Sequence, residues 1–183
     1  MFIETEQTPN PATLKFLPGR SVMAQGTADF ASAEAAERSP LAQRLFQVEG
    51  VSGVFLGSDF VTVAKAETKT WQVLKPAILG IIMEHFAANR PVILESTVAP
   101  AAEAGEDSEI VTQIKELLET RVRPAVAQDG GDIIFQGYED GVVFLHLQGS
   151  CAGCPSSTAT LKMGIENMLK HYVPEIVEVR AVA

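Results

Sequence analysis

Cys151 and Cys154 are the only two cysteines in the 183 residues, and two residues separate them. Two thiols on one chain cannot supply four thiolate ligands to a metal site. They lie between an apolar strand pattern and a helix pattern. At that position they could act as a redox dithiol, as half of a zinc site, or as half of an iron–sulfur site shared between two chains.

The residues around the two cysteines favour metal ligation over an inert structural role. Pro155 is typical of a first helical turn, and a helix N-terminus favours thiolate through its N–H groups and its dipole. Gly149 and Gly153 lack side chains, so the backbone can approach a bulky anionic group and donate hydrogen bonds to sulfur. We therefore expect Cys151 and Cys154 on a surface loop as ligands, with both glycines contacting the bound group.

The other two chemistries have less support. A zinc ion held by one chain needs two more ligands, and His85, His146 and His171 lie at no ligand-like spacing from the cysteines. We expect each histidine to be an ordinary surface or strand residue. A thioredoxin-like dithiol would follow a βαβ unit, whereas the pattern before the motif indicates a hairpin. A zinc site shared by two chains stays open on composition.

The overall composition argues against several classes of partner. The net charge is −9 with no cluster of Lys and Arg, which disfavours a protein that neutralises phosphates. The longest strongly apolar run, 76–83, is well short of the roughly 18–20 residues of a membrane span. Glu4 and Glu6 do not suit a transit peptide. We expect no nucleic-acid or membrane partner, and a location in the bacterial cytoplasm or, for a mature form, the mitochondrial matrix.

Charge and composition predict two domains. Residues 1–95 hold ten acids and eight bases, residues 96–109 hold four acids and no base, and residues 110–183 hold nine acids and six bases. The Ala, Pro, Gly and acid content of 96–107 suits a solvated linker. We predict two small α+β domains, 1–95 and 108–183, joined by this flexible acidic Ala/Pro linker.

Hydrophobic periodicity predicts the elements of the first domain. We expect two short strands between residues 2 and 16, a helix entered at Ser39-Pro40, strands at 51–56 and 60–63, and a helix from about 70 to 88. Five residues at helical spacing on that last helix are predicted to be core rather than the lining of a ligand pocket. They are Trp71, Leu74, Ile78, Ile82 and Phe86.

The second domain follows the order helix, hairpin, helix, strand. A helix at 110–128 continues or kinks across Pro124, and a hairpin of 133–135 with 142–147 precedes the cysteines. A helix from Pro155 and a last strand at 176–182 complete the domain. Between the first helix and the hairpin, Asp129-Gly130-Gly131-Asp132 is interpreted as a tight turn capped by its aspartates rather than as a metal site.

Three segments of the chain resemble a known family. Val122-Arg123-Pro124, leading to Asp129-Gly130-Gly131-Asp132-Ile133, and the segment 149–158 around the cysteines resemble the NifU C-terminal-type domain of the Nfu iron–sulfur proteins. Residues 8–16, Thr-Pro-Asn-Pro-Ala-Thr-Leu-Lys-Phe, are similar to the opening of the Nfu N-terminal domain. The resemblance covers both predicted domains, and the cysteines show no departure from it.

The resemblance implies that two protomers hold a [4Fe–4S] cluster between them through Cys151 and Cys154 of each. The homodimer would receive the cluster from upstream assembly machinery and pass it to apo client proteins. Counting ligands leads independently to a dimer, because a cubane cluster asks for four thiolates and each chain offers two. The protein would then be a scaffold or carrier and not an enzyme, with the cysteine-free domain recognising clients. The alternative is a dithiol–disulfide oxidoreductase that attacks with Cys151.

Overall fold

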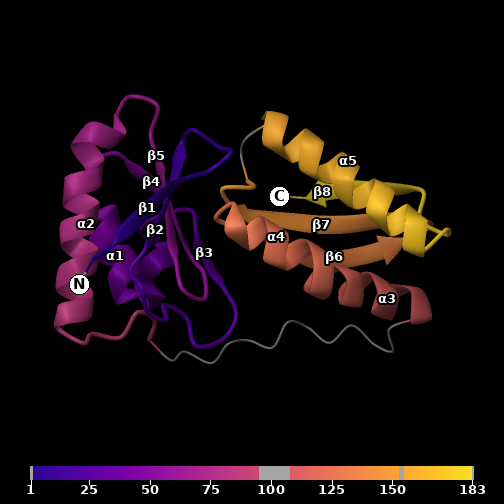
Figure 1. Cartoon of the computed structure of the whole chain (residues 1–183), viewed down its shortest axis with the longest axis horizontal. Helices are drawn as coiled ribbons and strands as arrows, with labels where there is room; N and C mark the ends of the chain where they lie inside the picture. Colours follow the sequence, from indigo (N-terminus) through magenta and orange to yellow (C-terminus); the bar gives the residue numbers. More distant parts are fainter. Residues whose placement is uncertain (1, 95–107, 153–154, 183) are drawn as a thin grey trace. The chain divides into compact units, whose positions relative to one another are not determined.

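The computed structural model describes residues 2–94, 108–152 and 155–182 (Figure 1). The chain divides into two compact units, Met1–Val98 and Ala99–Ala183, and both contain helices and sheets. The predicted α+β class is therefore confirmed. Within the described ranges, no helix combines the length and the hydrophobicity that crossing a membrane requires.

Several sequence predictions fall outside the described residues. These are the linker at 96–107 and two of the four predicted site residues, Gly153 and Cys154. Of residues 155–157, only the backbone is described.

The first unit is an antiparallel sheet with two α-helices on one side (Figure 1). Its strand order is β1-β2-β5-β4-β3, so β1 and β3 are the edge strands. Its elements in chain order are β1 (Glu4–Gln7), β2 (Thr13–Leu17), β3 (Ala28–Phe30), the 3₁₀-helix η1 (Ala35–Arg38), α1 (Pro40–Phe46), β4 (Val51–Leu56), β5 (Val61–Lys65) and α2 (Trp71–Ala87). Neither β3 nor η1 is among the elements predicted from the sequence.

The predicted start of α1 is confirmed in detail. Ser39 is the N-cap, and its Oγ accepts a hydrogen bond from the Ala42 N–H at 3.1 Å while donating to the Val92 carbonyl at 2.6 Å. Pro40 occupies the first helical position, where its missing N–H costs no intrahelical bond. The cap therefore begins the helix and also ties it to the chain that follows α2.

α2 supplies most of the helical core of this unit. Leu74, Ile78, Ile82 and Phe86 are buried, as the helical spacing predicts. Trp71 departs from the prediction, because it is only half-buried against this core and lines a cavity. As the first residue of α2, it lies where the helix begins to cover the sheet.

His85 contradicts the expectation of a surface or strand histidine. It lies on α2, its side chain is fully buried, and its Nε2 is 3.0 Å from the Pro91 carbonyl oxygen. Its Nδ1 has no hydrogen-bond partner among the described residues. Burial is the main cause that lowers the pKa of His85. The physical reason for the burial is helical phase, since residue 85 lies seven and three positions beyond Ile78 and Ile82.

The second unit packs helices on a three-stranded sheet of order β6-β7-β8. β6 and β7 are antiparallel, while β7 and β8 are parallel, so α5 is the crossover of a βαβ unit. Buried residues from all of its helices and from alternate strand positions form one core. The elements are α3 (Glu109–Leu117), the π-helical turn η2 (Leu118–Val122), α4 (Arg123–Gln128), β6 (Gly131–Glu139), β7 (Val142–Gly149), α5 (Pro155–Tyr172) and β8 (Glu178–Val182).

The predicted hairpin is confirmed, with longer strands than expected. Asp140 and Gly141 have φ values of 48° and 81°, which are the consecutive positive values of a two-residue hairpin turn. The predicted helix at 110–128 is continuous, but its irregularity is a π-helical turn that directly precedes α4. That turn accommodates Pro124 near the start of α4, where its missing N–H is tolerated.

Candidate functional site

Cys151 lies directly after β7, in the connection to α5. β7 ends at Gly149, whose φ of 65° lies in the left-handed region that favours glycine. The Ser150 N–H donates to the Gly130 carbonyl at 3.2 Å, and the Ala152 N–H donates to the Gly149 carbonyl at 3.2 Å. Gly149 therefore turns the chain out of the sheet and fixes where Cys151 begins.

The side chain of Cys151 is buried, so the expectation of a surface loop is wrong for this residue. Cys151 is 6% exposed and belongs to the apolar core of the second unit. Its sulfur lies against the backbone of Gly131 at the start of β6. A Cβ on Gly131 would overlap the Cys151 sulfur and would lie 2.8 Å from the Gln148 carbonyl oxygen. Only glycine leaves room for the sulfur in this position.

Burial raises the pKa of the Cys151 thiol to about 11. A hydrogen bond with the Ser150 side chain acts in the opposite direction, and the negative charges of Asp129 and Asp132 add to the rise. The position before a helix N-terminus predicts instead that thiolate is favoured here. In this conformation burial has the largest effect on the Cys151 pKa, so the thiol is protonated at neutral pH.

A buried ion pair anchors the start of β6 beside Cys151. Arg123 donates from Nε and Nη2 to the two carboxylate oxygens of Asp132, each at 2.9 Å. The Ile133 N–H donates to Asp132 Oδ1 at 2.8 Å, and the side chain of Asp132 is 4% exposed. Arg123 also pairs with the exposed Glu119 at 2.6 Å, and its pKa is raised, chiefly by Asp132. These contacts support the structural role predicted for Asp132, while the capping role predicted for the Asp129 side chain stays a prediction.

Further hydrogen bonds tie the cysteine segment to its neighbours. The Ser150 hydroxyl donates to the Asp129 carbonyl, and the Thr158 hydroxyl of α5 donates to the Cys151 carbonyl at 3.1 Å. The backbone around Cys151 is therefore fixed from both sides. Among the described residues, no group of three or more His, Cys, Asp and Glu side chains is arranged to hold a metal ion.

The structure thus brings together two of the four predicted site residues, Gly149 and Cys151, while Gly153 and Cys154 lie outside the described residues. Sequence reasoning missed the contact of Gly131 with the cysteine sulfur, because it assigned that glycine to the turn alone. Pairing of the two hairpin ends could have suggested the contact, since Gly131 pairs with Gly149. The motif also lies within a βαβ crossover, a connection that the hairpin reading did not foresee.

Comparison with known proteins gives two family matches. Residues 3–89 match a family described as the scaffold protein Nfu/NifU N terminal, and residues 114–180 match the NifU-like domain. A human relative, "NFU1 iron-sulfur cluster scaffold homolog, mitochondrial", is 55% identical over 179 residues, which cover 96% of this chain and 70% of the relative. The relative of the same name from Drosophila ananassae is 53% identical over 184 residues, covering 100% of this chain and 64% of the relative.

One solved structure with a related sequence is the solution NMR structure of a NifU-like protein from Saccharomyces cerevisiae. It is 28% identical, with a TM-score of 0.48, and the match covers 52% of this chain and 87% of that chain. The names of the human and Drosophila relatives give a mitochondrial location for those proteins. Of the two locations expected from the sequence, the bacterial cytoplasm receives no support from them.

Proposed function

Because the chain belongs to the Nfu family of iron–sulfur cluster scaffold proteins, we propose that it holds an iron–sulfur cluster and delivers it to apo-proteins. The observation that carries the proposal is the position of Cys151, one of only two thiols in the chain, at the β7–α5 junction of the unit that matches the NifU-like domain. Cys151 and Cys154 are the proposed ligands, and Gly149 and Gly153 are the proposed backbone contacts.

The cluster is proposed to be a [4Fe–4S] cluster shared by two protomers. Each chain supplies two of the four thiolates, so a symmetric dimer completes the ligand set near its two-fold axis. Few contacts from each protomer then hold the cargo. Opening the interface releases it, which suits a carrier better than a four-cysteine site within one chain.

The buried thiol of Cys151 bears on the choice between a carrier and a redox enzyme. An attacking thiol must be thiolate near neutral pH, whereas burial raises the pKa of Cys151 to about 11. Ligation by iron can displace the proton, because a metal ligand binds as thiolate and proton release accompanies binding. The raised pKa therefore disfavours the dithiol–disulfide oxidoreductase that uses Cys151, and we propose a protein with no turnover chemistry of its own.

The proposed division of labour follows the two domains, 1–95 and 108–183, with 96–107 as linker. The first domain contains no cysteine and recognises client proteins, which raises the effective concentration of a client near the cluster. Upstream assembly machinery supplies the cluster. A mitochondrial location is proposed from the names of the human and Drosophila relatives.

Anaerobic reconstitution with iron and sulfide tests this proposal. We expect broad visible absorption, a dimer by light scattering, and about two irons per chain, since four irons are shared by two chains. Mössbauer spectroscopy identifies the cluster type, and a [2Fe–2S] cluster would give about one iron per chain. A monomer that cycles a disulfide without binding iron would establish the redox alternative instead.

A further inference from the structure

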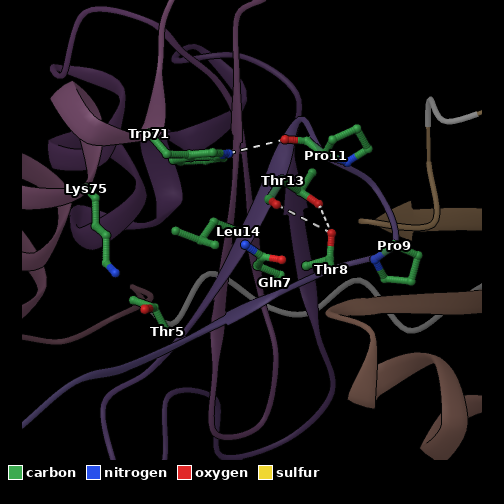
Figure 2. A pocket seen from close by; sticks show the side chains of 9 residues that line it. All are labelled: Thr5, Gln7, Thr8, Pro9, Pro11, Thr13, Leu14, Trp71 and Lys75. Atoms are coloured by element: carbon green, nitrogen blue, oxygen red, sulfur yellow. Dashed lines mark hydrogen bonds between the residues drawn. The ribbon is translucent and has the colours of Figure 1, made fainter.

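A cavity of about 450 Å³ lies in the first unit, between the edge strand β1 and the start of α2 (Figure 2). Thr5 and Gln7 of β1 line one side of it, and Trp71 and Lys75 of α2 line the other. Leu14 of β2 also contributes to the lining. Thr5 pairs with Phe16 and Gln7 pairs with Leu14. The side chains of Thr5 and Gln7 therefore lie on the face of the sheet that α2 covers.

The walls of this cavity are held in place without a ligand. The Trp71 indole N–H donates to the Pro11 carbonyl at 3.2 Å, which fixes the ring over the β1–β2 loop. The Thr8 hydroxyl of that loop lies 2.5 Å from the Thr13 hydroxyl at the start of β2, and the Ala12 N–H donates to the Asn10 side chain at 3.0 Å. A preformed site loses little conformational entropy when it binds a ligand.

The charge of the lining selects the chemistry of the ligand. Among the described residues that line the cavity, Lys75 has the only ionised side chain and none carries a carboxylate. Lys75 has no ion-pair partner among the described residues. The indole of Trp71 and the side chain of Leu14 provide apolar surface a short distance away. The cavity therefore suits a carboxylate beside an apolar group.

The adjoining strand selects the form of the ligand. β1 is an edge strand of the sheet, and none of the described residues pairs with its outer side. An edge strand offers backbone N–H and C=O groups to another extended segment. In a strand added to β1, residues i and i+2 lie about 7 Å apart on one face. That face would be the one on which Thr5 and Gln7 line the cavity.

We propose that β1 and this cavity bind an extended segment of a client protein, which adds a strand to the sheet. One side chain of the segment is acidic and meets Lys75, and the residue two positions away is apolar and packs on Trp71. This inference rests on the proposed role of the first domain in client recognition and names the chemistry of what it recognises.

The opposite face of β1 restricts which residues the client segment can carry. Glu4 and Glu6 lie on that face, and Glu6 pairs with Lys15 at 3.2 Å. A residue of the client segment that faces them is neutral or basic, because like charges on neighbouring strands repel. The same repulsion disfavours a second copy of this chain as the occupant, since β1 against β1 would bring four glutamates together.

Trp71 is the only tryptophan of the chain, so its fluorescence reports on the cavity directly. The probe is a short labelled peptide with glutamate and leucine two positions apart on one face and threonine on the other. We expect this peptide to shift the Trp71 emission of the full-length, cluster-free protein saturably, with weaker binding at higher salt. The control peptide has the same composition, with the glutamate moved to the opposite face, and should bind at least about tenfold more weakly.

Charge reversal at Lys75 provides the matched test on the protein side. Lys75→Glu should weaken the peptide about tenfold or more, whereas Arg90→Glu, the same charge change on an exposed residue outside the lining, should alter affinity by less than about twofold. Circular dichroism checks that both variants are folded, and peptide anisotropy measures affinity without the tryptophan. Protection of the β1 amides from exchange should accompany binding.

Four outcomes would overturn the inference. They are equal binding of the two peptides, unchanged affinity in Lys75→Glu, displacement of the peptide by succinate with the same emission shift, and dimerisation through β1 without peptide. Because the test uses cluster-free protein, its failure leaves the cluster proposal intact. Conversely, if reconstitution fails but peptide binding is retained, the proposal for β1 and its cavity stands.

Discussion

The two units hold their functional groups in opposite states. In the first unit, the cavity beside β1 is open and hydrogen bonds fix its walls, and its cation Lys75 lacks an ion-pair partner among the described residues. In the second unit, the Cys151 thiol is buried against Gly131 and is protonated. Under the two proposals, binding of a partner in the cavity needs no rearrangement of its walls, whereas ligation of a cluster by Cys151 needs the thiol to lose its proton.

The largest expected effect is loss of cluster binding in the second unit with no change in the first. Cys151→Ser or Cys154→Ser should abolish stable cluster binding, because the proposed dimer would lose two of its four thiolate ligands at once. Reconstitution followed by iron analysis and visible absorption measures the loss. The emission of Trp71 and the binding of the acidic peptide should not change. A variant that keeps its full iron content would contradict the ligand assignment.

The next largest effect is on the stability of the second unit, and it follows from removal of Arg123. Arg123→Met leaves the buried carboxylate of Asp132 without its ion pair and should lower the free energy of unfolding by about 3 kcal/mol. The side chain of Glu119, the other partner of Arg123, is 67% exposed. Glu119→Gln should therefore lower the free energy of unfolding by less than about 1 kcal/mol.

Urea titration followed by circular dichroism measures both variants. Trp71 fluorescence, which reports only on the first unit, should keep its wild-type midpoint in each. Equal losses for Arg123→Met and Glu119→Gln would show that the buried pair has no special weight.

Gly131 offers a test of how the Cys151 thiol is buried. Gly131→Ala should destabilise the second unit by about 1–3 kcal/mol, because the new methyl group overlaps the sulfur and crowds the Gln148 carbonyl. It should also expose the thiol and speed its alkylation by iodoacetamide. Gly137→Ala is the matched control in the same strand, since its Cβ would meet no atom within 4 Å. If alkylation is equally slow in both variants, burial of the thiol does not depend on Gly131.

The smallest expected effect is a pH dependence confined to the first unit. Burial lowers the pKa of His85 in the folded state, so the unfolded chain binds a proton more readily. Stability is therefore full above the unfolded pKa of about 6.5 and falls as the pH drops toward the lower folded value. Urea midpoints from Trp71 fluorescence between neutral and mildly acidic pH measure the fall. His85→Gln, which cannot titrate, should reduce this slope, and an identical slope would exclude His85 as its cause.

Local sequence signals predicted most of the fold. Ser39-Pro40 marked the start of α1, and Asp140-Gly141 marked the hairpin turn, because capping and turn chemistry depend on neighbouring residues only. The strand β3 was not predicted, since its three residues, Ala28–Phe30, show too short a pattern to read.

The site was less predictable than the fold. The pair Cys151 and Cys154 and its surroundings indicated ligands, but burial of Cys151 depends on Gly131, which lies twenty residues earlier and comes close only when β6 pairs with β7. Likewise, the indole of Trp71 had core spacing on α2. Its cavity forms where the start of α2 meets the edge strand β1 and the loop that follows it. Long-range contacts of this kind have no local sequence signal.

The π-helical turn between α3 and α4 reconciles the spacing of the buried residues with the period of the α-helix. Ile114, Leu118, Val122 and Val126 are all buried in one core and are spaced four apart. In a helix of 3.6 residues per turn, each step of four advances about 40°, so the last side chain would point roughly 120° away from the first. One wider turn takes back part of that rotation. Apolar residues at every fourth position, rather than at alternating spacings of three and four, therefore favour a π turn. Deleting a single residue there would rotate Arg123 away from Asp132 without changing either side chain.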